Sequence, residues 1–269
     1  MIKTTFKLLL GSAFLVLFII AFFGFIFYLK IPSAADLKDC MITKLYQVDL
    51  CSKNKNYVKI KDVSQFVKKA VVTSEDSLFY SHQGFDFQEL QKSFEKNLEK
   101  GKFVRGGSTI TQQLAKNLFL SKEKTLSRKL MEAIITTRIE KYLSKNEILE
   151  KYLNVVQFGK DIFGVYDASK LYFKKHPSQL ELLESVYLAF LLPSPEKYSK
   201  SYYKKSLTPF ARKQMSSIIN KMKASGKITE EQYSVAMDEL PYFLTGAKPE
   251  KIEIDFDQVI EEDIEEGIE

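Results

Sequence analysis

An uncharged, strongly apolar run of 22 residues, from Leu8 to Leu29, constrains this chain more than any other feature. At the helical rise of about 1.5 Å per residue, such a run extends for about 33 Å, close to the thickness of the hydrocarbon core of a bilayer. A helix of this length in a globular core normally carries polar residues on one side. The run therefore predicts a transmembrane helix over 8–29.

The charges beside this run predict its orientation. Lys3 and Lys7 precede it, which favours a cytoplasmic N-terminus over 1–7 and a domain outside the cytoplasm, although Lys30 weakens the asymmetry. A cleaved signal peptide is the alternative, with 33–35 as its cleavage site, but the apolar region of a signal peptide spans only about 7–15 residues. We favour the anchor, and nucleic acid is then not an expected partner.

The net charge of +6 is unevenly distributed. Residues 250–269 hold ten acidic residues and one lysine, a net of −9, so the preceding 249 residues carry +15. A basic body indicates an anionic partner, such as nucleic acid, anionic lipid or a phosphate-bearing substrate. The acidic tail over 250–269 has no long apolar stripe, which is typical of a solvated, disordered segment.

Helix-start signals predict one mainly α domain over 67–249, after a connector over 30–66 that holds a short strand around Tyr57 to Ile60. Cys40 and Cys51 either close a short loop in an oxidising compartment or stay free, and no Cys/His metal spacing exists. Pro193 and Pro195 end an apolar helix over 180–192, and Gly226 ends a helix over 209–225. Four Ser/Thr residues are followed three positions later by Glu or Gln and predict helix starts: Thr109/Gln112, Ser144/Glu147, Ser178/Glu181 and Thr229/Gln232.

A first segment, 75–86, brings four ionisable residues together: Glu75, Asp76, His82 and Asp86. A carboxylate that is partly desolvated beside another has a raised pKa, which suits it to proton transfer near neutral pH. The alternative is a helix end with solvated charges. The apolar residues expected to be buried here are Val71, Val72, Leu78 and Phe79.

A second segment, 105–117, places two glycines before a helix, whose free N–H groups favour binding of a phosphate. It lacks the spacing of a Walker loop. Ser108, Gln112 and Lys116 recur every four residues on one face, which is otherwise simply a polar helix surface. The opposite, buried face is expected to hold Ile110, Leu114 and Leu118.

A third segment pairs Arg128 with Glu132 at i, i+4, in a helix whose expected buried stripe is Leu126, Leu130 and Ile134. Alone it fits a surface salt bridge worth about 0.3–0.5 kcal/mol. In this order, however, the three segments resemble the EDxxFxxHxGfD, GGSTITQQLxKN and RKxxE blocks of the peptidoglycan glycosyltransferase family. Two further blocks follow, at 145–154 and 164–173, and the resemblance runs from Val67 to Tyr198.

The resemblance implies a mainly α, lysozyme-like glycosyltransferase domain with a membrane-proximal jaw region, preceded by the transmembrane helix. It implies an enzyme that joins lipid II into β-1,4-linked glycan strands with inversion at the anomeric carbon and release of undecaprenyl pyrophosphate. The implied location is the bacterial cytoplasmic membrane, with the catalytic domain outside. The implied partners are lipid II, the growing glycan strand, that membrane and other cell-wall synthesis proteins.

By position, the resemblance makes Glu75 the general base and Glu132 the second functional carboxylate, which assists the donor site or binds a divalent cation, Mg²⁺ or Mn²⁺. Lys116 and Arg128 would hold the donor pyrophosphate. The other implied substrate-binding residues are Ser108, Gln112, Lys124 and Lys129.

The chain departs from the family pattern at 158–165 and 184–189, outside these residues, which leaves details of the donor site open. Three SxxK matches raise the alternative of a bifunctional transpeptidase, but no KTG or SDN motif accompanies them, so a monofunctional enzyme is expected. A lysozyme-like glycan-cleaving enzyme that uses Glu75 as its acid and an inactive cell-wall scaffold are the remaining alternatives.

Overall fold

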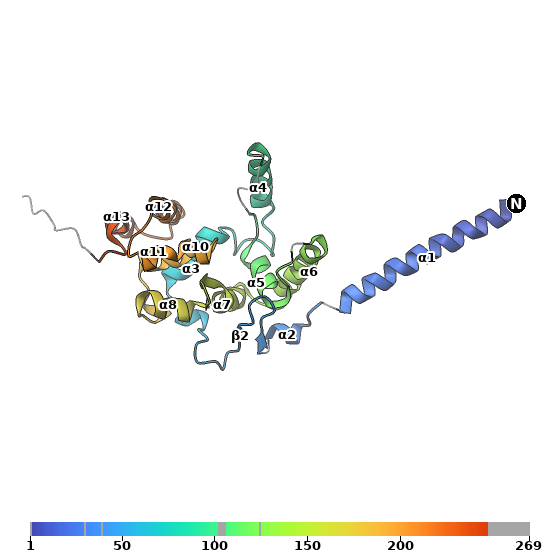
Figure 1. The fold of residues 1–269 in the computed structure, drawn as a ribbon, viewed down its shortest axis with the longest axis horizontal. Coiled ribbons are helices and arrows are strands. Elements are labelled where there is room, and N and C mark those ends of the chain that lie inside the picture. The colour runs from blue at the N-terminus through green and yellow to red at the C-terminus, as the bar shows by residue number, and fades with distance from the viewer. Residues whose placement is uncertain (1, 30, 39, 102–105, 124, 247–269) are drawn as a thin grey trace, which may run out of the picture.

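The structure, a computed structural model, describes residues 2–29, 31–38, 40–101, 106–123 and 125–246 (Figure 1). The predicted acidic tail therefore lies outside the described residues. Helices dominate, as predicted, and the strands are short. The α-helices are α1 (Ile2–Leu29), α2 (Ala34–Lys38), α3 (Gln65–Glu75), α4 (Phe87–Glu99), α5 (Ile110–Phe119), α6 (Leu126–Tyr142), α7 (Lys145–Val155), α8 (Val165–Phe173), α9 (Leu182–Leu191), α10 (Pro195–Tyr198), α11 (Lys200–Tyr203), α12 (Pro209–Ala224) and α13 (Glu230–Glu239). The 3₁₀ turns are η1 (Ile60–Asp62), η2 (Pro177–Gln179) and η3 (Leu240–Tyr242).

Three of the four predicted helix starts are confirmed, since Thr109, Ser144 and Thr229 each open a helix with a reciprocal capping box. The fourth is wrong, because Ser178 lies within η2, whose first residue is a proline. Glu181 then caps α9 together with Glu184, so the N-cap of this helix lies three residues later than predicted.

The predicted strand from Tyr57 to Ile60 is also wrong. Its polar groups are satisfied by side chains of α7 rather than by a partner strand. Asn154 of α7 accepts a hydrogen bond from the Val58 N–H at 2.8 Å and donates one to the Val58 carbonyl at 2.8 Å. The Tyr57 hydroxyl donates to Glu150 at 2.5 Å. This segment is thus fastened to α7.

Two small antiparallel hairpins complete the fold. β1 (Met41–Ile42) pairs with β2 (Asp49–Leu50), and β3 (Gln157–Gly159) pairs with β4 (Ile162–Phe163). A disulfide between Cys40 and Cys51 brackets the first hairpin, which answers the question that the sequence left open. Among the described residues of the segment 30–66, four buried side chains belong to the hydrophobic core: Leu37, Leu50, Val58 and Val63.

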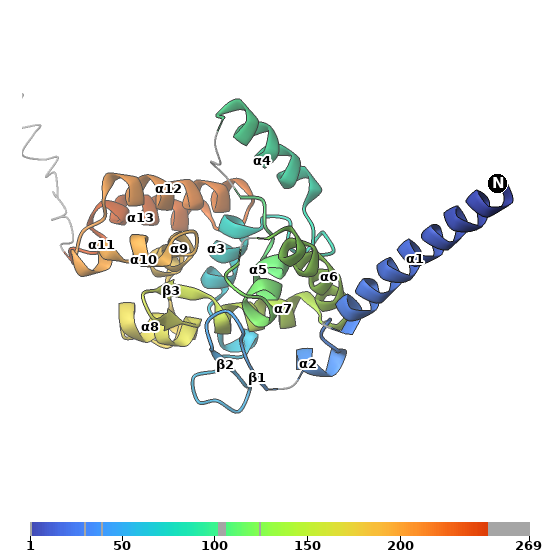
Figure 2. The ribbon, with the colours of Figure 1, turned by 45° about the vertical axis from the view of Figure 1, so that its right-hand side comes forward.

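The centre of the core lies between α3 and α9. Nine of the ten residues of α9 are buried, and α3 packs against both α9 and α12. On the other side of the molecule, α5 packs against α6 and α7 (Figure 2). Since α3 is held along its length by buried residues such as Val67 and Val71, its last residue, Glu75, has a fixed position.

Helix α1 covers the whole apolar run and extends away from the other helices (Figures 1 and 2). Large apolar side chains along it are exposed, among them Phe14, Phe18, Phe22 and Phe25. Several other side chains of α1 are outside the described set. Within that set, no helix combines the length and the apolar character needed to cross a membrane. The transmembrane helix over 8–29 therefore stays a prediction.

Candidate active site

Glu75 is the last residue of α3, and its carboxylate is held by a chain of hydrogen bonds. Gln113 Nε2 of α5 donates to Glu75 Oε2 at 2.9 Å, and the Tyr152 hydroxyl of α7 donates to Gln113 Oε1 at 3.0 Å. Burial raises the pKa of Glu75, and the charge of Asp76 raises it further, against the lowering effects of the Gln113 hydrogen bond and of Lys116. The carboxyl is thus oriented by Gln113 and its pKa is raised above the ordinary value, a direction that suits a group which takes up a proton.

Asp76 ties the end of α3 to the start of α5. Its buried carboxylate accepts hydrogen bonds from the Ile110 N–H at 3.0 Å and from His82 Nε2 at 2.7 Å. His82 Nδ1 accepts the Gly84 N–H at 3.1 Å, which places the imidazole proton on Nε2. Gly84 has a φ of 90°, and a Cβ at this residue would lie 2.7 Å from the Thr136 methyl group of α6. These contacts fix the turn that follows Glu75.

Replacing Asp76 with alanine is expected to destabilise the fold by at least about 2 kcal/mol, because it leaves the Ile110 N–H and the His82 ring buried without their partner. The measurement is the free energy of unfolding in urea. Asp238→Ala, at an exposed position of α13, is the control and should change stability by less than about 0.5 kcal/mol. Equal stability of the two variants would contradict this account.

The N-terminus of α5 is partly occupied by side chains of the protein itself, and the predicted phosphate seat stays a prediction. The Ile110 N–H is bound by Asp76, and the N–H groups of Thr109 and Gln112 are bound by each other's side-chain oxygens. Gln112 is buried in this cap, whereas Ser108 is exposed. A Cβ at Gly107 would lie 3.2 Å from Leu90 of α4, so this glycine permits close packing of the segment before α5 against α4. Three N–H groups of this helix start, those of Thr109, Ile110 and Gln112, are used inside the protein.

The buried faces that the sequence predicts for the helices of the site are confirmed in α5 and wrong in α6. Ile110, Leu114 and Leu118 are buried as predicted. Leu78 is 41% exposed, because α3 has ended at Glu75 and the helical period no longer applies. In α6, Leu126 and Leu130 are 90% and 58% exposed, since the helix is rotated relative to the predicted orientation. The stripe that α6 buries is Met131, Glu132, Ile135, Thr136 and Ile139.

This rotation places Glu132 in the protein interior, where it is only 3% exposed. Arg128 Nη1 donates to one carboxylate oxygen at 2.8 Å, and Lys129 Nζ donates to the other. The alternative of an ordinary surface salt bridge is therefore wrong. Arg128 Nε is buried and has no hydrogen-bond partner among the described residues, so it can donate to a ligand.

Lys116 interacts electrostatically with this cluster and with Glu75. Its side chain is half-buried, and burial lowers its pKa, with further lowering by the charges of Arg128 and Lys129. The charges of Glu132 and Glu75 act on it in the opposite direction. Lys116 is thus within electrostatic reach of every other charged residue predicted for the site and described here. Lys124 lies outside the described residues.

Both oxygens of Glu132 accept hydrogen bonds from cations, Arg128 and Lys129, and its predicted role as a metal ligand stays a prediction. Within the described part of the chain, no group of three His, Cys, Asp or Glu side chains could hold a metal ion. The donor set favours an anion, which the three cations Lys116, Arg128 and Lys129 would attract.

Two site residues, Gln113 and Tyr152, were given no role from the sequence, although they lie in the segments 105–117 and 145–154. They lie on different helices, so the sequence alone does not bring them together. Gln113 directly follows Gln112, yet one amide serves the helix cap and the other reaches Glu75. Only the packing of α5 between α3 and α7 reveals this difference.

Comparisons with known proteins agree with this geometry. The transglycosylase family profile matches residues 42–223. A biosynthetic peptidoglycan transglycosylase of Nitrosospira multiformis is 43% identical over 166 residues, which cover 62% of this chain and 70% of the relative. Its counterpart in Aromatoleum aromaticum is 49% identical over 146 residues, 54% of this chain and 64% of the relative. The counterpart in Chromobacterium violaceum is 43% identical over 170 residues, 63% and 75% of the two chains. Since the family profile matches more than half of its length, this chain belongs to the transglycosylase family.

Proposed function

We propose that this chain is a peptidoglycan glycosyltransferase that polymerises lipid II into β-1,4-linked glycan strands with inversion at the anomeric carbon. The observation that carries the proposal is that α5 links Glu75 to the cations of α6. Gln113 of α5 binds the Glu75 carboxylate, Lys116 follows three residues later on the same helix, and α5 packs against α6, which carries Arg128 and Lys129. A base and cations on adjoining helices suit a reaction in which a hydroxyl attacks and a diphosphate leaves.

In this reaction Glu75 takes the proton from the 4-hydroxyl of the acceptor sugar. The freed oxygen attacks the anomeric carbon of the donor on the face opposite the diphosphate, which accounts for the inversion. A carbon–oxygen bond forms to the acceptor while the carbon–oxygen bond to the diphosphate breaks, and the electron pair leaves with undecaprenyl pyrophosphate. Lys116, Arg128 and Lys129 stabilise the negative charge that develops there, and Glu132 holds the last two in place.

The substrate's lipid requires a site near a membrane, and α1 supports such a location. We infer that its apolar run over 8–29 anchors the domain in the cytoplasmic membrane, with the N-terminus inside and the catalytic domain outside. The exposed apolar side chains of α1 and its separation from the other helices favour this arrangement (Figure 2). A lysozyme-like core, a membrane-facing jaw and contacts with other cell-wall synthesis proteins belong to the same proposal.

The test is incubation of the purified full chain with lipid II, with and without a chelator. Formation of polymeric glycan supports the proposal, and shortening of preformed glycan without polymerisation would favour a lytic enzyme instead. The comparison with and without chelator tests whether polymerisation requires Mg²⁺ or Mn²⁺.

The pH profile of kcat/KM tests the role of Glu75. A base acts when deprotonated, so the rate should rise with pH through its pKa, and the raised pKa places this acidic limb above the usual value of 4.5. Gln113→Ala removes a hydrogen bond that lowers this pKa and should move the limb to higher pH. Gln91→Ala removes a similar bond to Glu95 on the exposed face of α4 and should leave the profile unchanged. A limb at the same pH in all three proteins would contradict the assignment.

A further inference from the structure

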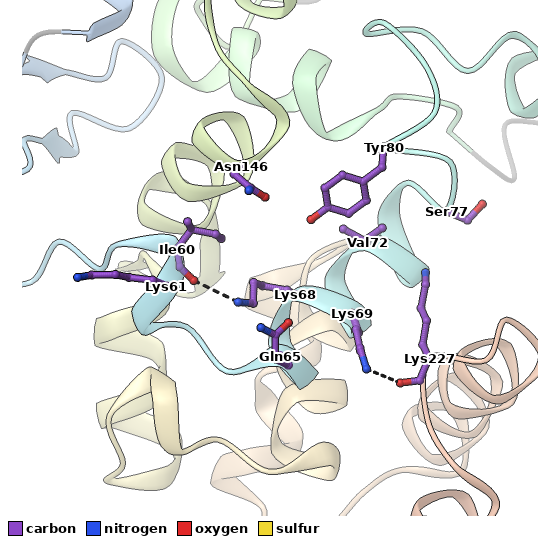
Figure 3. A pocket seen from close by; sticks show the side chains of 10 residues that line it. All are labelled: Ile60, Lys61, Gln65, Lys68, Lys69, Val72, Ser77, Tyr80, Asn146 and Lys227. Carbon is purple, nitrogen blue, oxygen red and sulfur yellow. Dashed lines mark hydrogen bonds between the residues drawn. The ribbon is translucent and has the colours of Figure 1, made fainter.

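A pocket of about 470 Å³ lies beside α3, on the part of this helix that precedes Glu75 (Figure 3). It is bounded by η1, by the turn after α3, by the start of α7 and by the residue that follows Gly226 after α12. Four lysines line it: Lys61, Lys68, Lys69 and Lys227. None of these was part of the site built above.

Three of these lysines donate hydrogen bonds to uncharged groups. Lys68 Nζ donates to the Ile60 carbonyl at 3.2 Å, and Lys69 Nζ donates to the Lys227 carbonyl at 2.8 Å (Figure 3). Lys227 Nζ donates to the Thr73 hydroxyl at 2.7 Å. Among the described residues that line the pocket there is no aspartate or glutamate.

Without a bound anion, this arrangement disfavours the charged form of the lysines. Burial lowers the pKa of Lys68 and of Lys227, and the charge of Lys69 lowers the pKa of Lys227 further. Positive charges that repel one another in a half-buried cavity are stabilised when an anion binds between them. The pocket therefore has the electrostatics of an anion site.

The remaining walls indicate what kind of anion fits. Gln65, Ser77 and Asn146 offer amide and hydroxyl groups, and Val72 and Tyr80 add an apolar surface. A bare inorganic ion can accept hydrogen bonds from these amides and hydroxyls but leaves the apolar surface unused, whereas a short peptide with carboxylates uses both. The volume lies within the range of about 300–1,000 Å³ that ligand sites occupy.

We propose that this pocket binds a short peptide through its carboxylates, and that the peptide is the one carried by the sugar substrate. The geometry supports the link, because Lys68 precedes Glu75 by seven residues of the same helix, about two turns or roughly 10 Å. Peptidoglycan precursors carry a peptide with free carboxylates on one sugar of each disaccharide. The identification of the peptide as part of the sugar substrate rests on the proposed function, whereas the binding of a peptide with carboxylates does not.

The experiment measures binding of an N-acetylmuramyl peptide with free carboxylates to the full chain in detergent, by titration calorimetry. The double variant Lys68→Gln/Lys227→Gln should raise the Kd about tenfold or more, since two charge-assisted hydrogen bonds are lost. The control Lys213→Gln/Lys221→Gln removes the same charge from exposed positions of α12 and should leave the Kd unchanged. The same peptide with its carboxylates amidated should bind weakly to all of these proteins.

Folding of each variant is checked by its thermal unfolding curve. Lys61→Gln gives a second test that does not endanger the fold, since this side chain is exposed, and it should also weaken binding. An unchanged Kd in both the double variant and Lys61→Gln would overturn the proposal. It would also be overturned if inorganic phosphate, or vesicles of phosphatidylglycerol, bound through these lysines more tightly than the peptide.

The lipid II assay keeps the two proposals apart. Polymerisation by the wild-type protein without lysine-dependent peptide binding would overturn the pocket and leave the proposed function standing. Lysine-dependent peptide binding without polymerisation would support the pocket as a peptide site and count against the proposed function. If both hold, the double variant should raise KM for lipid II with little change in kcat, because the pocket binds the substrate away from the reacting atoms.

Discussion

Glu75→Gln is expected to lower kcat for lipid II polymerisation by about 10²- to 10⁴-fold while the protein keeps its fold. The amide has nearly the same size as the carboxylate, and its oxygen can still accept the hydrogen bond from Gln113 Nε2. What it cannot do is take the proton from the acceptor hydroxyl. Since burial raises the pKa of Glu75, the substitution also removes a group whose charge is costly in the folded state. Its stability should therefore not fall.

The control is Glu95→Gln, which removes a carboxylate that accepts a hydrogen bond from Gln91 on the exposed face of α4. It should leave kcat within about twofold of the wild-type value. Polymerisation rates are compared at saturating lipid II, and unfolding in urea verifies that both variants are folded. Near-normal turnover by Glu75→Gln would remove Glu75 from its role as base.

Features encoded within one helical turn were predictable from the sequence. The capping boxes at Thr109, Ser144 and Thr229 involve residues three positions apart, so the pattern alone determines them. The fourth predicted start, at Ser178, is wrong because Ser178 lies in the 3₁₀ turn η2, which begins with a proline. Local signals predict a helix start only where no second local signal overlaps them.

Features that depend on tertiary packing were not predictable. The segment at Tyr57 and Val58 is extended, yet its partner is the side chain of Asn154, 96 positions from Val58. The buried stripe of α6 could be found only by knowing that Glu132 turns inward with Arg128. Hydrophobic periodicity places apolar residues inside, and it therefore fails where a buried carboxylate occupies the core-facing position.

The candidate site shows the same division. The clustering of Glu75 with Asp76 and His82 was visible in the sequence, but the roles of the two neighbours were not. Asp76 binds the Ile110 N–H at the start of α5, and the N–H groups of Thr109 and Gln112 are bound within the helix cap. We therefore expect side-chain cations to hold most of the anion's charge, which gives Lys116 a larger part in the reaction than its spacing from Ser108 and Gln112 indicated.

Lys116→Gln is accordingly expected to lower kcat/KM by about 10²- to 10³-fold, the loss that follows removal of one group that stabilises charge in a transition state. If Lys116 binds the diphosphate more strongly as it leaves than in the bound substrate, most of this loss should appear in kcat rather than KM. Lys116→Arg keeps the charge in a half-buried site and should recover part of the activity, whereas Lys221→Gln, on the exposed face of α12, should have no effect. Steady-state rates over a range of lipid II concentrations separate these results. If only KM changes, Lys116 binds the substrate and does not act in the transition state. If Lys116→Gln is as active as Lys221→Gln, the charge of Lys116 takes no part in the chemistry.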